Sequence, residues 1–448
     1  MRAVDAGYEL SVAGDKPETI TAQHVVVATG SSARALPSLD FDEETVLSND
    51  GALRLAGVPK KLAVIGAGVI GVSCALQLAE RGLSVTVIDR QPPCEGASFG
   101  NAGVISPWSC VPQSVPGLWR RIPKWLIDPE GPIFIRKGYA ASFLPWALRF
   151  LAAGKADKVD GIGDAMMALS RNSPSHYRAL LSDRTEVELI QDSVYVFAYK
   201  QAEQANLDHF GWKMRRQRDV PLSLISAGAL KEREPDISDA YQAAILIHEQ
   251  ARALNPSALG KAVAEKAKSH GVQFIQAETK ALKSEAGGWL VECQDSDFRA
   301  NNIVLAAGVW SASLLRPFGY KLPLEAERGY HLLCRNPGVT IHNSLMDVEH
   351  MCVASQMQAG IRIAGTAEFA GIEADADNRR AFIFKKALKN LFPAINTEQA
   401  EPWMGRRPTF PDSLPCIGPV DGVDGLFAAF GHGHFGLSQA PTTGRIIA

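Results

Sequence analysis

The stretch Val64-Ile65-Gly66-Ala67-Gly68-Val69-Ile70-Gly71 decides the fold class of this chain. Its apolar start predicts a strand, its glycines predict a tight turn, and the residues that follow predict a helix over 72–81. Gly66 permits the sharp turn, Gly68 lets backbone N–H groups approach a pyrophosphate, and Gly71 lets the helix pack closely on the strand. Phosphate oxygens would then lie at the positive N-terminus of that helix.

A carboxylate stands where this motif requires one. Asp89 closes the apolar segment 84–88, which we expect to be the second strand. At that place a carboxylate accepts hydrogen bonds from the hydroxyls of the adenosine ribose and repels a 2′-phosphate. The strand, the glycine turn, the helix and the acid together predict a dinucleotide site.

The composition favours a two-domain globular protein and excludes several other classes. The chain has 448 residues, of which 46% are hydrophobic, enough for two cores. Its net charge of −2 provides no overall positive potential that would attract nucleic acid, so we expect no nucleic-acid partner. Seven cysteines without a CxxC pair or metal-type spacing predict reduced thiols in the cytoplasm and no metal site. We find no signal-peptide pattern and no apolar run of the roughly 18 residues that would predict a membrane span.

Strand patterns far downstream indicate that the nucleotide-binding domain is discontinuous. The segment 300–308 is apolar and ends in small residues, so it can run beside the first strand with Gly308 near the cofactor. A helix over 258–269 and a strand over 272–275 precede it. We therefore predict an α/β fold with two parts. The Rossmann-like parallel sheet would comprise 58–111, 236–321 and 401–448, and an α+β substrate domain, with an antiparallel sheet over the cofactor and flanking helices such as 379–391, would comprise 112–235 and 322–400.

Residues 1–57 repeat this strand pattern without a phosphate loop of their own. Residues 7–70 resemble an interior fragment of dihydrolipoamide dehydrogenase, notably in Ala28-Thr29-Gly30, Ala35-Leu36-Pro37 and Val58-Pro59-Lys60-Lys61-Leu62. The redox-active cysteine pair and the catalytic histidine and glutamate of that family are missing. Our interpretation is an orphan N-terminal extension, residues 1–57, joined to the rest within the shared glycine stretch.

From about residue 61 onward the chain resembles the D-amino-acid dehydrogenase branch of the D-amino-acid oxidase family, which are FAD-dependent amine oxidoreductases. The resemblance rests on the glycine turn and on the separated motifs 97–106, 305–311, 327–331, 405–408, 411–415 and 431–437. It implies FAD as the cofactor. It also implies oxidative deamination of an amino acid, with a D-amino acid as the first interpretation, to a 2-oxo acid and ammonia in amino-acid catabolism.

The resemblance also implies a set of cofactor contacts. The glycine-rich loop after the second strand would meet the pyrophosphate and the flavin edge, unless it is an ordinary loop. A helix that begins near Gly436 would direct its N-terminus at the flavin and stabilise negative charge on the ring, while either nearby histidine could instead cap this helix. The expected contacts are Gly66, Gly68, Gly71, Asp89, Arg90, Ser98, Asn101, Ala102, Gly308, Gly431, His434, Gly436 and Leu437.

Three residues are expected at the substrate. Arg407 matches the family's Gly-x-Arg-Pro pattern, and its guanidinium suits bidentate binding of a carboxylate. The role of its neighbour Arg406 stays open. Tyr330 and His331 would line the pocket, with core packing of the tyrosine ring as the alternative. No residue stands out in the sequence as a base for the substrate amine.

The segment Leu118-Trp119-Arg120-Arg121-Ile122-Pro123-Lys124-Trp125-Leu126 mixes cations with tryptophans. This mixture suits a membrane surface that bears quinones. Electrons would then pass to a quinone or another carrier, with oxygen as the alternative acceptor. On that interpretation a cytoplasmic protein contacts the inner membrane peripherally. The alternative is a set of solvated basic loops around a tryptophan core.

Two further functions stay open as alternatives. One is oxidation of glycine or of a secondary amine such as hydroxyproline or sarcosine, because the same carboxylate clamp would serve these substrates. The other is a dihydrolipoamide dehydrogenase fragment or a chimera without catalytic function.

Overall fold

The computed structural model describes residues 2–4, 7–12, 18–23 and 61–448. The chain divides into two compact units, Met1–Val58 and Pro59–Ala448. In the first unit, strands β1 (Arg2–Val4), β2 (Gly7–Val12) and β3 (Glu18–Ala22) form an antiparallel sheet. The segments around residues 28–37, on which part of the N-terminal resemblance depends, lie outside the described residues.

The second unit contains the predicted Rossmann-like sheet. Strand β4 (Lys61–Ile65), helix α2 (Val69–Glu80) and strand β5 (Ser84–Asp89) follow one another as the glycine motif requires. The sheet order is β11-β5-β4-β15-β22-β21, and only β21 runs antiparallel to its neighbour. The remaining strands are β11 (Gln273–Gln276), β15 (Asn302–Leu305), β21 (Cys416–Pro419) and β22 (Leu426–Phe430). Strand β15 therefore lies beside β4, as predicted.

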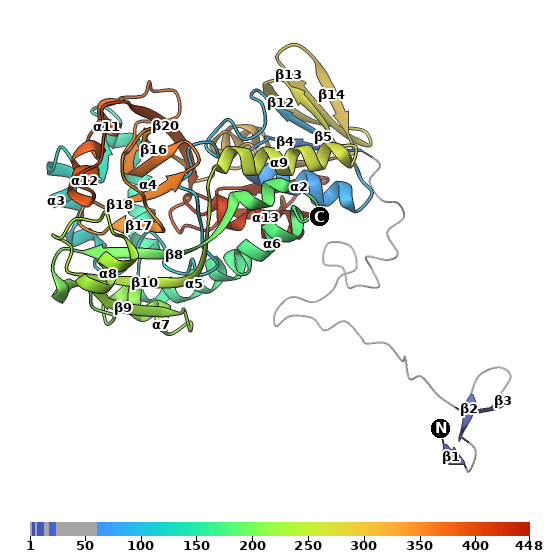
Figure 1. Ribbon diagram of the computed structural model, residues 1–448. Helices are drawn as coiled ribbons and strands as arrows, with labels where there is room; N and C mark the ends of the chain where they lie inside the picture. The colour runs from blue at the N-terminus through green and yellow to red at the C-terminus, as the bar shows by residue number, and fades with distance from the viewer. Residues whose placement is uncertain (1, 5–6, 13–17, 24–60) are drawn as a thin grey trace. The chain divides into compact units, whose positions relative to one another are not determined.

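Both faces of this sheet are covered, which is why its strands are apolar throughout. Leu62 and Val64 of β4 pack with α2, α9 (Pro256–Ser269) and α13 (Gly436–Ile447). These three helices lie side by side in Figure 1. Ala63 and Ile65 face the other way, toward the small sheet of β12 (Thr279–Glu285), β13 (Gly288–Cys293) and β14 (Asp297–Ala300).

The predicted antiparallel sheet is a ten-stranded sheet with the path β20-β16-β19-β18-β17-β8-β10-β6. Strand β7 pairs with β19 and strand β9 pairs with β10. Its strands are β6 (Val104–Ile105), β7 (Ile133–Ile135), β8 (Ile190–Tyr199), β9 (Leu222–Ser226), β10 (Ala243–Ala253), β16 (Glu325–Cys334), β17 (Ser344–Asp347), β18 (Cys352–Met357), β19 (Gly360–Phe369) and β20 (Ala400–Thr409).

The predicted division into a cofactor and a substrate domain stays a prediction. Strands β6, β10 and β20 fall in ranges that we expected with the cofactor domain, yet they pair within the ten-stranded sheet. The alternation of a strand shows which side chains share a face but does not name the partner strand.

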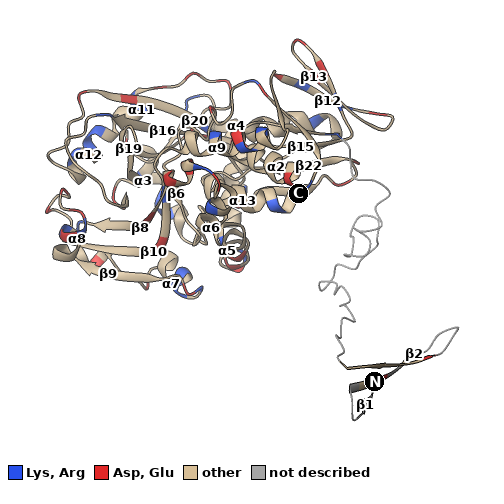
Figure 2. Ribbon diagram, turned by 45° about the vertical axis from the view of Figure 1, so that its right-hand side comes forward, with Lys and Arg blue, Asp and Glu red and all other residues tan. Residues whose placement is uncertain are grey.

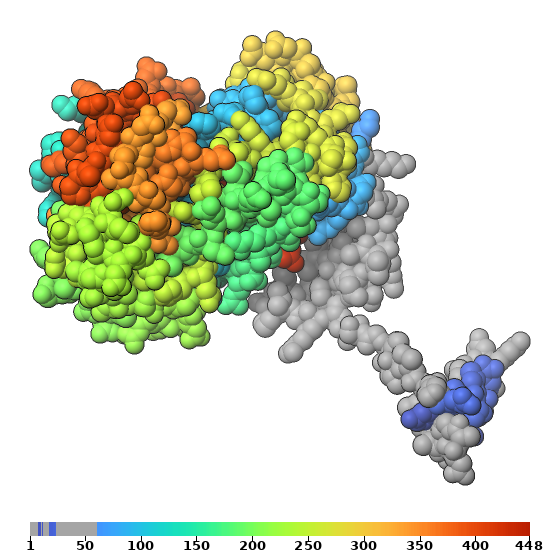
Figure 3. Space-filling view, in the orientation of Figure 1, coloured from blue at the N-terminus to red at the C-terminus, as the bar shows by residue number. Residues whose placement is uncertain are grey.

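Further helices of this unit pack on the ten-stranded sheet or, as α5 and α6 do, against α13. They are α3 (Ile122–Ile127), α4 (Ala140–Ala153), α5 (Ala156–Ser170), α6 (Ser173–Leu180), α7 (Phe210–Arg216), α8 (Ala227–Arg233), α11 (Arg379–Phe382) and α12 (Phe384–Leu391). Figure 3 shows the green segment of α5 and α6 against yellow α9, where Lys266 forms an ion pair of 2.9 Å with Asp183.

Charges of both signs are interspersed along the elements in Figure 2, in keeping with the small net charge. In the described ranges, no helix combines the length and the apolar character needed to cross a bilayer. All seven cysteines lie in these ranges and are free thiols. The same ranges hold no cluster of three or more His, Cys, Asp or Glu side chains suited to a metal ion.

Candidate active site

The glycine turn is as tight as its sequence predicts. Gly66 has a φ of +110°, and a Cβ there would lie 2.4 Å from the carbonyl oxygen of Ala306. A Cβ on Gly71 would lie 1.9 Å from the Gly66 carbonyl oxygen. A side chain at Gly66 would therefore push the turn away from the end of β15, and one at Gly71 would push α2 away from the turn.

Two side chains hold the start of α2. Ser98 Oγ accepts a hydrogen bond of 3.0 Å from the backbone N–H of Val69, and Asp89 Oδ2 accepts one of 2.6 Å from Ala67. Asp89 Oδ1 accepts a third, of 2.8 Å, from the N–H of Gln91. Each carboxylate oxygen keeps a second acceptor site, which a ribose hydroxyl can use.

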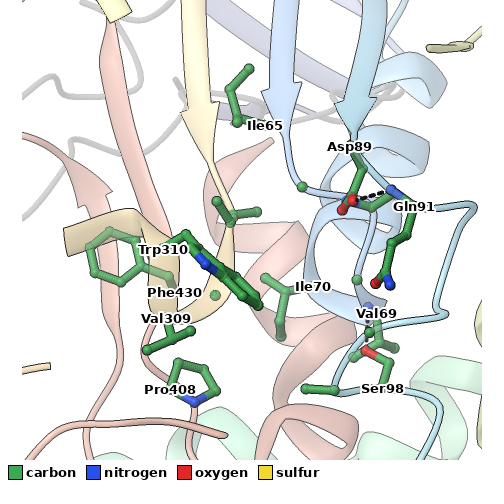
Figure 4. A pocket seen from close by; sticks show the side chains of 18 of the residues that line it. Ile65, Val69, Ile70, Asp89, Gln91, Ser98, Val309, Trp310, Pro408 and Phe430 are labelled. Carbon is green, nitrogen blue, oxygen red and sulfur yellow. Dashed lines mark hydrogen bonds between the residues drawn. The ribbon is translucent and has the colours of Figure 1, made fainter. Parts of the chain in front are cut away.

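A cavity of about 360 Å³ opens at the carboxyl ends of the parallel strands. Figure 4 shows Asp89 and Ser98 on one side of it and Trp310, Phe430 and Pro408 on the other. Most of the predicted cofactor residues line the cavity, namely Gly66, Gly68, Asp89, Arg90, Ser98, Asn101, Gly308, Gly431, Gly436 and Leu437. Gly71, Ala102 and His434 are not among its lining residues.

The donor set of this cavity fits FAD. The N-terminus of α2 provides backbone N–H groups for the pyrophosphate, and Asp89 provides acceptors for the ribose. The guanidinium of Arg90 lies 3.7 Å from the ring centre of Trp310, and both residues line the cavity. Trp310 was not predicted, although it closely follows the small-residue end of the segment 300–308.

Strands β16 and β20 pair so that Glu327 lies opposite Arg407. Glu327 Oε1 accepts hydrogen bonds from Arg407 Nη1 at 2.8 Å and from His434 Nε2 at 2.5 Å. Its Oε2 accepts from Thr409 Oγ1 at 3.1 Å and from Gln113 Nε2 at 3.3 Å. Burial by itself would raise the pKa of Glu327, but His434 and Arg407 outweigh it and hold this pKa well below its usual range.

The structure brings Arg407 and His434 together, but Arg407 is already paired. Besides Glu327, its guanidinium contacts the carbonyl oxygen of Thr366 at 3.0 Å. The guanidinium lies directly over Gly329, where an added Cβ would be 2.1 Å from Cζ. Its Nη2 also contacts the carbonyl oxygen of Gly365 at 3.5 Å, and the side chain as a whole remains 21% exposed. Arg406, which lies next to it, lines the cofactor cavity.

His331 shares this face of β16 but faces the glycine-rich loop. Its Nδ1 donates a hydrogen bond of 3.1 Å to the Gly100 carbonyl, and its ring stacks on Trp403 with centres 4.9 Å apart. Burial, assisted by the nearby Arg362 cation, lowers the pKa of His331 to about 3. Arg362 donates to the carbonyls of Phe99 and Asn101, so both side chains hold the loop in place.

Tyr330 lies on the opposite face of β16, and the structure does not bring it together with Arg407 and His331. Its hydroxyl donates a hydrogen bond of 2.6 Å to Glu368, which also pairs with Arg328 at 2.8 Å. Burial, and then Glu368, raise the pKa of Tyr330. This environment is the packed core that the sequence left open as the alternative.

Glu327, Gln113 and Thr409 were missed from the sequence. A signal existed for Glu327, because the alternation of the strand places residues 327, 329 and 331 on one face. No local pattern marked Gln113, which reaches Glu327 from a loop more than two hundred residues away.

Comparison with known proteins agrees with this geometry. The family model described as FAD dependent oxidoreductase (DAO) matches residues 61–448, and the model described as Pyridine nucleotide-disulphide oxidoreductase matches residues 2–102. The chain is 34% identical over 398 residues to a D-amino-acid oxidase of Bradyrhizobium diazoefficiens, covering 87% of this chain and 94% of that protein. It is 30% identical over 400 residues to a D-amino acid dehydrogenase of Rhizobium johnstonii, covering 86% and 94%.

Solved structures show the same fold at lower identity. A glycine oxidase from Bacillus cereus matches with a TM-score of 0.66 at 18% identity, covering 87% of this chain and 93% of that one. An iminodiacetate oxidase from Chelativorans matches with a TM-score of 0.66 at 21% identity, covering 86% and 94%. With its glycine turn, its cavity and these relatives, the chain belongs to the DAO family of FAD-dependent oxidoreductases.

Proposed function

We propose that this enzyme oxidises the Cα–N bond of a D-amino acid to an imino acid, which water converts to a 2-oxo acid and ammonia. The observation that carries this proposal is the partly exposed side chain of Arg407, held by Glu327 near the turn that leads into α13. A guanidinium presents paired N–H groups that suit a substrate carboxylate. The names of the curated relatives at 30–34% identity support a D-amino acid as the substrate.

Positioning is the main contribution of the residues at this site. Arg407 would bind the carboxylate so that the Cα–H bond is directed toward the flavin, and fixed geometry can remove a large part of a barrier. Helix α13 begins at Gly436, which lines the cavity, and its positive N-terminus stabilises negative charge there. Bound FAD supplies the two-electron acceptor that this oxidation requires.

Anaerobic bleaching of the flavin tests this proposal. The purified FAD-loaded protein is mixed with D- and L-amino acids, glycine, sarcosine, hydroxyproline and dihydrolipoamide, and the flavin absorbance is followed. We expect D-amino acids to bleach the flavin fastest. Faster bleaching by glycine or a secondary amine would contradict the proposed substrate class, and bleaching by none of them would contradict the proposed activity.

We further propose that the surface formed by α3, α4 and the 3-10 helix Leu118–Arg120 contacts anionic lipid and that a quinone accepts the electrons. Leu144, Leu148 and Leu151 form one exposed stripe of α4, whereas Phe143 and Trp146 pack inward on Phe369. Trp119 and Ile127 are exposed as well, beside the cations of 120–124. Exposed apolar groups flanked by cations are typical of interfacial binding.

Sedimentation with vesicles tests the lipid contact. We expect the FAD-loaded protein to bind vesicles that contain phosphatidylglycerol and to bind pure phosphatidylcholine vesicles weakly. The double variant Leu144→Asp/Leu148→Asp should lose this binding, while Leu224→Asp, which alters an exposed leucine of β9, should retain it. Equal sedimentation of the parent and the double variant would contradict the proposed surface.

A further inference from the structure

The carboxylate of Glu327 is the centre of a four-donor cluster. Oε1 accepts from Arg407 and His434, and Oε2 accepts from Thr409 and Gln113. A carboxylate has about four acceptor positions, so this one is saturated. Glu327 therefore has no position left for a substrate group, and its side chain, 4% exposed, is not accessible to one.

His434 keeps one ring nitrogen for another partner. It lies in the turn between β22 and α13, and its neighbours Gly433 and Gly436 line the cofactor cavity. Its hydrogen bond to Glu327 uses Nε2, which must carry the proton because a carboxylate only accepts. When the ring is neutral, Nδ1 then keeps its lone pair, on a side chain that is 39% exposed.

The reaction proposed above needs such a lone pair, because an amino acid enters as an ammonium and the amine must be neutral before hydride leaves Cα. We propose that His434 Nδ1 accepts this proton and that Glu327 is a positioning residue, which holds His434 and Arg407 at a fixed separation. This inference rests on the proposed function.

The step balances in atoms and charge. One N–H bond of the ammonium breaks, its electron pair stays on nitrogen, and the proton forms a bond to Nδ1. The amine lone pair would then form the C=N bond as the Cα–H bond breaks, with the hydride passing to the two-electron acceptor that bound FAD supplies. Glu327 stabilises the imidazolium that results, and this cation, on a side chain that is 39% exposed, releases its proton to solvent.

The other charged groups of this face do not serve as the proton acceptor. Glu327 is saturated, and its pKa is held well below the usual range. Arg407 is always charged. His331 has committed Nδ1 to Gly100, and burial lowers its pKa to about 3. The charged groups of the cluster that holds His434 are Glu327 of β16, which His434 contacts, and Arg407 of β20, which pairs with the same carboxylate oxygen.

The pH dependence of anaerobic flavin bleaching by a D-amino acid tests this role. At pH 7 we expect His434→Gln to slow bleaching on the order of 10²-fold, the usual contribution of a general base. The deficit should shrink as pH rises toward the ionisation of the substrate ammonium, because the amine then arrives neutral. Glu327→Gln should shift the pH profile, and His270→Gln, at the remote end of α9, should match the parent. An equal loss at every pH, or the parent profile in His434→Gln, would overturn the assignment.

Chemical labelling gives a readout that does not depend on turnover. Diethyl pyrocarbonate acylates neutral imidazole, and mass spectrometry measures the modified peptide. Saturating 2-methylalanine, which has no Cα–H and cannot be oxidised, should protect His434 at least tenfold and leave the exposed His270 unprotected. Absence of protection would overturn the inference. A parent enzyme that D-amino acids bleach, but whose His434 is not protected, leaves the proposed function standing, whereas a parent that no amino acid bleaches removes both.

Discussion

Two arginine–glutamate pairs lie on opposite faces of strand β16 and differ in what they leave free. Arg328 and Glu368 are 2.8 Å apart with fully buried side chains, and Arg407 and Glu327 are also 2.8 Å apart. Arg328 has its other donors on the carbonyls of Ala374 and Asp375, so the first pair is closed. Arg407 is still 21% exposed. The two pairs therefore have the same N–O distance but different exposure, and exposure distinguishes a structural pair from one that can bind substrate.

The largest expected effect is on the closed pair. Arg328→Met should lower the free energy of unfolding by about 3–5 kcal/mol, because it removes the fully buried cation beside Glu368 and leaves this buried charge with only the part-exposed Arg136 and the Tyr330 hydroxyl as partners. Urea denaturation of the FAD-loaded protein measures this loss. The double variant Arg328→Met/Glu368→Leu should recover only part of it, because Tyr330 and Arg136 lose their shared acceptor. A loss below about 1 kcal/mol, the usual value of an exposed pair, would contradict the structural role assigned to Arg328 and Glu368.

The next effect separates binding from folding. Arg407→Ala should lower kcat/KM for a D-amino acid by an amount that corresponds to about 2–5 kcal/mol of lost transition-state stabilisation. Its free energy of unfolding should change less than that of Arg328→Met. Arg407→Lys keeps the charge but loses the bidentate geometry, so its loss should be smaller. The matching amine without a carboxylate completes a double-mutant cycle. Equal losses for both substrates would show that Arg407 supports the fold or the flavin site instead.

A third variant is a control for both arginine–glutamate pairs, because it alters a cofactor residue and neither Arg328–Glu368 nor Arg407–Glu327. Asp89→Ala should weaken FAD binding by about 1.5–3 kcal/mol for each hydrogen bond lost to the ribose. Titration of the apoprotein with FAD, followed by flavin absorbance, measures this change. Substrate KM should stay near that of the parent once FAD is saturating. An unchanged Kd for FAD would contradict the ribose assignment.

The smallest effect concerns acid stability on the site face of β16. His331 has a pKa of about 3 in the folded protein, because of burial and then Arg362, and about 6.5 when unfolded. Between these values only the unfolded chain binds the proton, so stability falls as pH decreases from about 6.5, by up to ~1.4 kcal/mol per pH unit. The buried His432, whose pKa burial also lowers to about 3, acts in the same direction. In urea denaturation at about pH 6.5 and about pH 5.5, His331→Gln should show a smaller decrease than the parent, and an equal decrease would refute this account.

The sequence predicted the parts of the fold that depend on local patterns. Gly66, Gly71 and Asp89 each have a reason within the β4-α2-β5 unit, so their spacing was sufficient to predict the turn, the helix and the position of the acid. The apolar strand β15 was recognisable because both faces of the sheet are covered. The helix expected over 379–391 was found as α11 and α12, which divide at Ile383.

The site was harder to predict because its contacts join distant segments. Glu327 and His434 are 107 residues apart, and no local pattern links them. The face that Tyr330 occupies depends on the pairing of β16, whose register with β19 shifts between Arg328 and Tyr330. A motif placed Tyr330 and His331 in one short stretch, whereas the direction of each side chain follows from pairing that only the folded chain supplies.

The strand order of the parallel sheet has a consequence for synthesis on the ribosome. The residues that line the cavity come from within 65–101, 306–314 and 429–437, among others, so its first wall emerges long before its last. At the usual elongation rate of ~5–20 residues per second, the first wall waits roughly 20–70 s for its partner. FAD cannot stabilise the nascent chain during that interval, because a ligand stabilises only the state that binds it. The exposed apolar edges of β4 and β5 are then the segments that a chaperone would need to cover.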